Sequence, residues 1–347
     1  MKNKLFKIIT LVLAICILSG CGAKNYIVDK KGNIVKYEKT GQTLPTNILC
    51  KPTDKKLYNI YKDNGTKMKV PVNKLPKCEN FKINIKDSKS IWEGLFIKPL
   101  AYLIIKLGKL VNNYGMSVIL IGLAIRILLL PVSIKTQRQS ENMKKINPEI
   151  QKIEKKYANQ TTNEAMMAKS QEMMMLYKKY NVSPFSSCLM AFIQLPLFLA
   201  FLQAINRVPV IFEGSLFGMS LGMTPLTGLK NGNYIYIILI ILIIVTTYFS
   251  LKKAFDSTAS TNPAQAGSMK TTLYMSIVLI VFTAFNLSTA IGLYWVSTNG
   301  FIVIQNYLLS NIVENKSKKG DNKKQKQIKS SIKEKSEKRR WINGKDS

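Results

Sequence analysis

Long apolar blocks alternate with lysine-rich segments along this chain. Clear apolar runs cover about 115–133, 184–205 and 234–249, and a longer block covers 273–309. A run of about 20 apolar residues is long enough to cross a bilayer as a helix, and the last block has room for two short crossings. The polar residues 286–289 offer the break between them. The pattern predicts an all-α membrane protein with five spans within 113–310.

The charges between these blocks predict which side each loop faces. Segment 135–180 and the tail 311–347 are rich in lysine, whereas the loop 207–233 has only two basic residues. Basic loops stay in the cytoplasm. We therefore expect 135–180, 251–270 and the tail inside and 207–233 outside. A single span over 273–309 would place the basic tail outside, against this rule.

Residues 1–20 have the pattern of a processing signal. Three lysines precede the apolar run 8–17, which is about half as long as a membrane span. The following Leu18-Ser19-Gly20-Cys21 resembles the bacterial lipobox. Cleavage is then expected before Cys21, with a diacylglycerol on its thiol. The alternative is an ordinary first span with an incidental cysteine.

The segment 21–90 is polar and is expected outside the membrane, tethered through Cys21. Short alternating runs on either side of Gly32-Asn33 predict a small β-hairpin. Cys50 and Cys78 lie in a compartment that permits oxidation, so the alternatives are a disulfide and two unpaired thiols. A segment this short can hold only a marginal core.

The segment 91–112 is apolar but carries Lys98, Lys106 and Lys109. At 100° per residue Lys98 and Lys109 nearly coincide. One charged and one apolar face predict an amphipathic helix that lies in the membrane interface. A true span is the alternative.

Composition narrows the functions that this chain can have. Hydrophobic residues make up 47% of it, yet its formal net charge is +32, a balance that suits a polytopic membrane protein with basic flanks. It has no histidine and no C-x-x-C pair, so no metal site is expected. No phosphate-binding loop is present, and no predicted span contains a carboxylate. We expect no catalytic residue and no cofactor beyond the lipid at Cys21.

One charge lies in the middle of a predicted span. Burying Arg126 there costs about 2.5–3.5 kcal/mol by insertion scales and roughly 10–17 kcal/mol in simulations of lone helices. Gly115, Gly122, Arg126 and Ser133 fall within about 40° of one another on a helix. This stripe predicts a polar groove that attracts acidic or polar peptide segments. The other interpretation is a structural arginine satisfied by backbone carbonyls and water.

Polar faces in other spans could complete such a groove. Gln194 shares a face with Ser187 in the second span, and Thr246 shares one with Ser250 in the third. Trp295 and Asn299 share a face in the fifth. The predicted groove residues are therefore Arg126, Gln194, Thr246, Trp295 and Asn299.

Three stretches resemble motifs of the YidC/Oxa1/Alb3 family of membrane protein insertases. They are Arg126-Ile-Leu-Leu-Leu-Pro131, the run from Asn181 to Phe198 that contains Cys188, Gln194 and Pro196, and Gly292-Leu-Tyr-Trp-Val-Ser-Thr-Asn299 followed by Gln305-Asn-Tyr307. Their order and spacing match the family over most of 91–310. Met190 stands where the family commonly has proline, and no proline precedes the Gly292 motif.

The resemblance implies an insertase and chaperone for nascent membrane proteins, acting alone or beside the Sec translocon, with Arg126 as the charge of its groove. It also implies a bacterial cell-membrane location, and the lipobox resembles the Gram-positive branch. The alternative is a small-anion transporter or channel that uses Arg126. The sequence shows neither the inverted repeats nor the paired broken helices common in transporters.

Two cytoplasmic parts offer further contacts. Helical stretches at 147–157 and 163–180 predict a hairpin within 135–180, and its second arm contains Met166, Met167, Met173, Met174 and Met175. Flexible thioethers suit contact with varied apolar segments, although packing inside the hairpin explains them equally well. The tail after residue 313 has 13 basic and 5 acidic residues and is expected to be disordered. The ribosome, anionic lipids, or topology alone could account for its charge.

Overall fold

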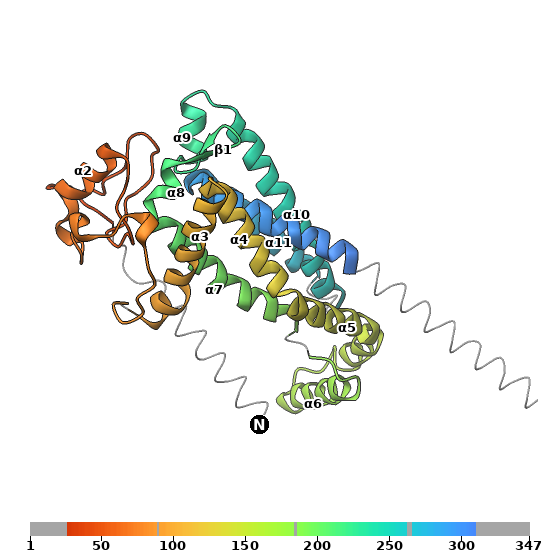
Figure 1. Cartoon of the computed structure of the whole chain (residues 1–347). Coiled ribbons are helices and arrows are strands. Elements are labelled where there is room, and N and C mark those ends of the chain that lie inside the picture. The colour runs from red at the N-terminus through yellow and green to blue at the C-terminus, as the bar shows by residue number, and fades with distance from the viewer. Residues whose placement is uncertain (1–25, 89, 184–185, 262–265, 310–347) are drawn as a thin grey trace, which may run out of the picture. The chain divides into compact units, whose positions relative to one another are not determined.

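The computed structural model describes residues 26–88, 90–183, 186–261 and 266–309 (Figure 1). The expected signal peptide, the expected lipidation site Cys21 and the expected disordered tail therefore lie outside the described residues. Two compact units divide the chain, 1–302 and 303–347, and the contacts given below lie within the first.

Helices make up most of the described chain. The long ones are α4 (Tyr114–Leu128), α5 (Leu130–Lys156), α6 (Asn163–Lys179), α7 (Ser186–Asn206), α10 (Ile235–Thr261), α11 (Ala266–Asn286) and a last helix at 289–309. The shorter elements are α2 (Lys55–Asn64), η1 (Gly65–Lys67), η2 (Val72–Lys74), η3 (Cys78–Asn80), η4 (Glu93–Ile97), α3 (Lys98–Leu110), α8 (Pro209–Glu213), β1 (Ser215–Leu216), β2 (Met219–Ser220) and α9 (Pro225–Lys230).

Length and composition single out one helix within the described residues. The stretch Ile235–Lys252 of α10 is long and apolar enough to cross a membrane alone, and α4 with α5 passes the same test as one bent pair. The apolar parts of α7 and α11, Ile193–Asn206 and Thr271–Asn286, are shorter. At 1.5 Å per residue they measure roughly 21 and 24 Å, against about 30 Å of hydrocarbon.

The first expected span, 115–133, is not one straight helix. α4 ends at Leu128 and α5 begins at Leu130, with a bend of 52° between them. Pro131 lies in the first turn of α5, where its missing N–H is harmless and its fixed φ suits a helix start. The break between α11 and the last helix lies where the sequence predicts it, since Leu287 and Ser288 are not helical.

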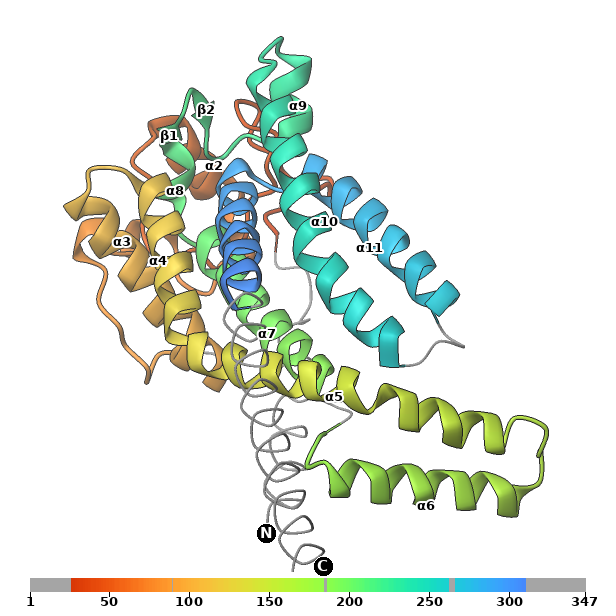
Figure 2. The ribbon, with the colours of Figure 1, turned by 90° about the vertical axis from the view of Figure 1, so that its right-hand side faces the viewer.

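The expected cytoplasmic hairpin is formed by α5 and α6, which run side by side in Figure 2. The sequence predicted that the first arm begins at Asn147. In the structure α5 begins at Leu130 and continues through Pro148. Met143, Ile146, Ile150 and Ile153 of α5 pack with Leu176 of α6. Thr162 caps α6 by accepting a hydrogen bond from the N–H of Ala165.

In the helical segment after residue 90, the exposure of the lysines differs from the sequence expectation. It starts with the π turn η4 and continues as α3. Lys106 and Lys109 are exposed, but Lys98 is only 7% exposed and donates from Nζ to the backbone oxygen of Asn84 at 2.7 Å. Lys98 and Lys109 lie in the same helix α3 as the spacing requires, but the Lys98 end of their shared face is buried. The chain before η4 folds back over the start of α3 and covers that end of the face.

Residues 26–84 form a small N-terminal domain. The predicted β-hairpin is present as one isolated antiparallel bridge, Val28 with Ile34, around a turn in which Gly32 has φ +85°, and a second bridge, Lys36 with Thr43, closes the next turn, in which Gly41 has φ +73°. The core is built from Ile27, Tyr37, Leu44, Ile48, Leu57, Tyr61, Met68, Val72 and Leu75. Asp54 caps α2, and hydrogen bonds from the N–H groups of Leu57 and Lys56 hold the pKa of its carboxyl below the ordinary value.

A disulfide joins Cys50 to Cys78 across this domain. Both cysteines are buried, in the same apolar cluster as Phe81 and as Trp92, which precedes η4. The pairing that the sequence left open is therefore formed, and it closes a loop with a sequence separation of 28 residues.

The N-terminal domain rests on residues 207–234, which we call the cap segment (α8, β1, β2 and α9). Leu49 N–H donates to the backbone oxygen of Arg207 at 2.8 Å. Glu213 accepts from the N–H groups of Thr53 and Asp54 at 2.8 and 3.1 Å. These contacts attach a domain made early in the chain to a loop made about 160 residues later.

We predict that Cys50→Ser with Cys78→Ser lowers the free energy of unfolding of the N-terminal domain. Opening a loop of this length restores chain entropy to the unfolded state worth about 3–4 kcal/mol. The measurement is urea-dependent protease sensitivity of residues 26–84 in the purified full chain. Reductant should reproduce the loss in the unmodified protein and have no further effect on the double variant. An unchanged midpoint would contradict a stabilising role.

Candidate functional site

The polar stripe predicted from spacing is buried on the protein side of its helices. Gly115 and Gly122 of α4 are buried, and Arg126 and Ser133 are 3% and 7% exposed. Leu120, Ile127 and Leu128 of α4 are exposed. The structure therefore gives α4 one polar, inward face and one apolar, outward face, as the sequence predicts.

Gly122 brings α4 against the last helix. A Cβ atom at Gly122 would lie 3.1 Å from Cδ2 of Tyr294 and 3.2 Å from Cγ2 of Thr298. Arg126 lies one turn further along the same face of α4. Glycine favours this close approach, because any larger side chain would require Tyr294 or Thr298 to shift.

Both of these helices start at the cap segment. At the start of α4, Asn113 donates from Nδ2 to the backbone oxygen of Ser215 at 3.1 Å. At the start of the last helix, Thr289 donates from its N–H and its hydroxyl to the backbone oxygen of Met223, at 3.0 and 2.7 Å. Arg126 follows Asn113 by 13 residues, so its Cα lies roughly 20 Å along α4 from this end.

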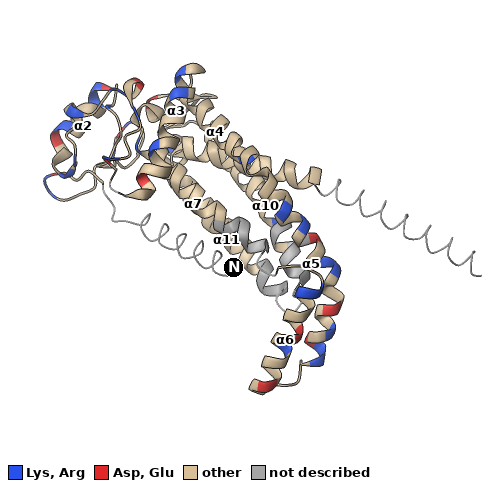
Figure 3. Cartoon of the chain, turned by 60° about the horizontal axis from the view of Figure 1, so that its bottom comes forward, with Lys and Arg blue, Asp and Glu red and all other residues tan. Residues whose placement is uncertain are grey.

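Arg126 keeps hydrogen-bonding capacity that the described residues do not use. Its Nε and Nη2 atoms are buried and have no hydrogen-bond partner among the described residues. No described Asp or Glu lies within ion-pair distance of its guanidinium. Figure 3 shows charged residues gathered on the hairpin and the N-terminal domain, whereas α7 is uncharged along most of its length. Arg126 is therefore a buried cation without a counter-ion among the described residues.

The predicted residues of the last helix bind α10 rather than Arg126. Trp295 donates from Nε1 to the hydroxyl of Thr247 at 2.8 Å. Ser250 donates from its hydroxyl to Oδ1 of Asn299 at 3.1 Å. Thr246, the predicted residue, donates to the backbone oxygen of Leu242 in its own helix at 2.7 Å. The neighbouring Thr247 makes the contact between helices.

Aromatic rings join the last helix to α7 on another side. Tyr294 stacks on Phe201 with ring centroids 4.2 Å apart, and Phe198 meets Trp295 edge-on at 4.9 Å. Gln194 lies one turn before Phe198 on α7 and is half-buried. The structure thus places Arg126, Trp295 and Asn299 on helices in mutual contact, with Gln194 on the neighbouring α7.

The sequence reasoning missed two polar residues of this region. Gln137 of α5 is 9% exposed, and its Nε2 atom is buried without a partner among the described residues. It follows Arg126 by 11 residues and Ser133 by 4, so the spacing that identified the stripe could have found it. Thr247 was missed because Thr246 stands beside it, and spacing cannot decide between adjacent threonines.

The methionines of α6 face outward. Met166, Met167, Met174 and Met175 are 57–65% exposed, and only Met173 packs against the hairpin core. Packing inside the hairpin therefore explains one of the five methionines. The other four leave an apolar, flexible surface on α6.

We predict that Thr247→Val weakens the attachment of α10 to the last helix. The change keeps the side-chain shape but leaves the indole N–H of Trp295 without its acceptor. Hydrogen bonds between membrane helices contribute about 0.6 kcal/mol on average and at most about 1.7. A double-mutant cycle with Trp295→Phe, followed by unfolding in mixed micelles, should give a coupling energy of this size.

Thr246→Val is the matched control for that cycle. Its hydroxyl bonds within its own helix, so its coupling to Trp295→Phe should be near zero. Equal coupling at both threonines would show that the hydrogen bond is not the connection between the helices.

Known proteins resemble this chain over its helical part. The model of the 60Kd inner membrane protein family matches residues 106–318. The chain is 33% identical to membrane protein insertase YidC 2 of Bacillus anthracis over 240 residues, 68% of this chain and 88% of that protein. It is 36% identical to membrane protein insertase MisCA of Bacillus subtilis over 226 residues, 64% of this chain and 80% of that protein. The chain therefore belongs to the 60Kd inner membrane protein family, the YidC/Oxa1 family of membrane protein insertases.

Proposed function

We propose that this chain inserts nascent membrane proteins into the cell membrane and that Arg126 receives their polar segments. Relatives named as insertases support the activity, whereas the alternative of an anion transporter or channel gains no support from them. The observation that supports the role of Arg126 is its buried guanidinium, with two nitrogens that lack partners among the described residues.

The energy of a buried charge explains how such a site would work. A guanidinium in hydrocarbon costs several kcal/mol, and unused donors add the cost of lost hydrogen bonds with water. A carboxylate or carbonyl from a passing peptide supplies acceptors and lowers both costs. The client's polar segment also loses hydrogen bonds with water when it enters lipid. Contact between that segment and Arg126 therefore lowers the desolvation cost of both. We expect no covalent step and no catalytic residue in this process.

The other predicted groove residues divide into two roles in this proposal. Trp295 and Asn299 hold the last helix to α10 through Thr247 and Ser250. Gln194 is half-buried on α7, and the amide nitrogen of Gln137 has no partner among the described residues, so both are better placed to bind a client together with Arg126. Thr246 contributes a hydroxyl already bonded to its own helix.

A five-span topology suits the helices described. α4 with the start of α5, α7, α10, α11 and the last helix would cross the membrane, with the α5–α6 hairpin inside and the cap segment outside. The short apolar parts of α7 and α11 would thin the bilayer locally. Thinning shortens the hydrophobic barrier that a client's polar tail must cross.

The partners follow from the surfaces available. The exposed methionines of α6 offer a first contact to apolar client segments inside the cell. Joint action with the Sec translocon is proposed from the family resemblance alone. The tail 311–347 would bind the ribosome or anionic lipids through its charge.

Replacement of Arg126 tests the client-binding role. Arg126→Ala should lower insertion of a client with an acidic translocated tail by about tenfold or more, because a charge-assisted hydrogen bond contributes about 1.5–3 kcal/mol. Arg126→Lys should keep much of the activity, although it lacks the forked donors of arginine. The assay measures insertion and protein abundance in parallel.

Two controls sharpen this test. A client whose tail is uncharged should depend less on Arg126, and Gln194→Arg should partly restore insertion by Arg126→Ala. Normal insertion of the acidic-tailed client by Arg126→Ala at normal abundance would leave Arg126 as a structural residue only.

Lipid anchoring and topology can be tested together by protease treatment of intact protoplasts. Leu18-Ser19-Gly20-Cys21 predicts a mature N-terminal peptide that begins at Cys21 with diacylglycerol. Peptides from 26–84 should be released, whereas peptides from 311–347 should appear only after lysis. A mature chain that retains residues 1–20 would exclude the anchor, and early release of the tail would exclude five spans.

A further inference from the structure

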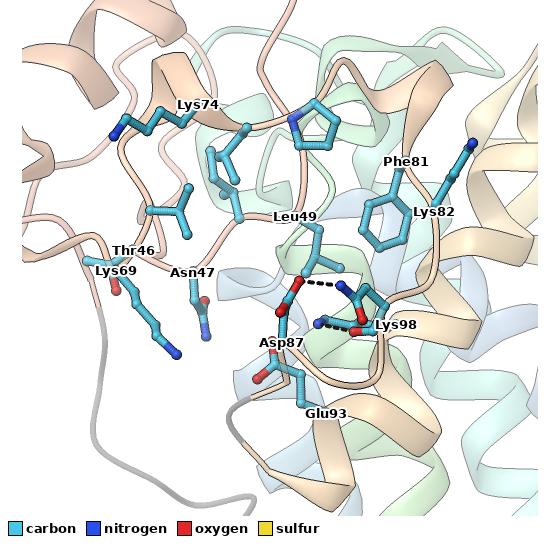
Figure 4. Close-up of a pocket in the computed structure, with 15 residues that line it drawn as sticks. Thr46, Asn47, Leu49, Lys69, Lys74, Phe81, Lys82, Asp87, Glu93 and Lys98 are labelled. Carbon is cyan, nitrogen blue, oxygen red and sulfur yellow. Dashed lines mark hydrogen bonds between the residues drawn. The ribbon is translucent and has the colours of Figure 1, made fainter.

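A pocket lies between the N-terminal domain and the start of α3 (Figure 4). Its volume is about 280 Å³. The apolar part of its wall comes from Ile48, Leu49, Val70, Leu75, Pro76 and Phe81. The family match begins at residue 106, so every residue that lines this pocket lies in the part of the chain that the family model does not cover.

Positive charge dominates the polar part of the wall. Lys69, Lys74, Lys82 and Lys98 line the pocket, and Figure 4 shows the first two on one side of it and the last two on the other. None of these lysines forms an ion pair with a described carboxylate.

Two carboxylates, of Asp87 and Glu93, also line the pocket, and both have partners within the protein. Glu93 lies 3.3 Å from Nη1 of Arg207. Asp87 accepts a hydrogen bond from Nδ2 of Asn84. The lysines therefore outnumber the acids, and the acids are already engaged, so the pocket presents a net positive charge.

Lys98 supplies a second, independent indication of a ligand. It is 7% exposed, and among the described residues its Nζ atom makes one hydrogen bond, to the backbone oxygen of Asn84. An ammonium group has three donors. A lysine buried in this way without a paired charge is rare, because desolvation of the ammonium is costly. An anion in the pocket would supply the missing acceptors.

Exposed apolar side chains lie at, or within two residues of, positions that line the cationic pocket. Val70, Ile83 and Ile85 are 42%, 41% and 64% exposed, and Ile91 and Leu95 are 85% and 60% exposed. Ile85 lies beside η4, because a Cβ atom at Gly94 would be 3.1 Å from its Cγ2 atom. Apolar side chains next to lysines are typical of protein surfaces that enter the headgroup region of a membrane.

We propose that this pocket binds the headgroup of an anionic phospholipid. Such a lipid joins the two required chemistries in one molecule: its phosphate accepts hydrogen bonds from Lys98 and the rim lysines, and its acyl chains lie against Ile85, Ile91 and Leu95. A soluble phosphate compound would satisfy the lysines but leave the apolar border in water. A zwitterionic lipid carries a cation that the lysines repel.

Native mass spectrometry of the full chain in detergent tests the site with dioleoylphosphatidylglycerol as the probe. Combined Lys69→Gln, Lys74→Gln and Lys82→Gln should weaken the tightest binding of this lipid about tenfold or more, since three charge-assisted contacts are lost. These lysines are exposed, so their replacement should not unfold the domain. A photoreactive derivative of the lipid should crosslink to peptides within residues 69–98 of the unmodified chain.

The matched control replaces three exposed lysines outside the pocket, namely Lys31→Gln, Lys55→Gln and Lys56→Gln. This variant has the same net charge as the test variant and should bind the lipid as the unmodified chain does. Equal weakening in both variants, or crosslinks confined to other peptides, would overturn the proposal. Equal binding of dioleoylphosphatidylcholine would overturn the preference for an anionic lipid. Displacement of the lipid by millimolar glycerol 1-phosphate would overturn the assignment to a lipid and leave a soluble phosphate as ligand.

Discussion

The cost of removing the Arg126 guanidinium from water is the constraint on which the rest of this molecule depends. A charge in hydrocarbon is tolerated only where surrounding structure fixes it in a polar stripe. Here that stripe runs from Gly122 of α4 to Gln137 of α5, across the bend at Leu129. The helices must therefore be held in place by contacts that do not use the arginine itself.

Those contacts lie at the ends and on the outer sides of the stripe. The cap segment holds the first turns of α4 and of the last helix through Asn113 and Thr289. Hydrogen bonds from Trp295 and to Asn299 fix α10, and stacked rings fix α7. Because these groups bind one another, Arg126 keeps two guanidinium nitrogens without partners among the described residues. The side chains that hold the helices together are thus different from the one proposed to bind clients.

The sequence predicted what depends on spacing within one helix and missed what depends on contacts between distant segments. The face shared by Gly122 and Arg126 could be predicted because 3.6 residues make one turn. The choice of Thr247 over Thr246 depends on how α10 is rotated against Trp295, which spacing does not determine. The burial of Lys98 depends on a preceding loop that folds back over it. The hydrogen bond from the N-terminal domain to Glu213 joins residues far apart in the sequence, and no local pattern predicts it.

The contact between the N-terminal domain and Glu213 also sets the order in which parts of the protein can assemble during synthesis. Thr53 and Glu213 are separated by 160 residues. At a synthesis rate of 5–20 residues per second, the docking partner of the N-terminal domain emerges roughly 10 to 30 s after the domain itself. During that interval the domain has only its own core and its disulfide, and the surface that will meet the cap segment stays open. During its own synthesis the protein is therefore a partly assembled membrane protein, as nascent clients of an insertase are.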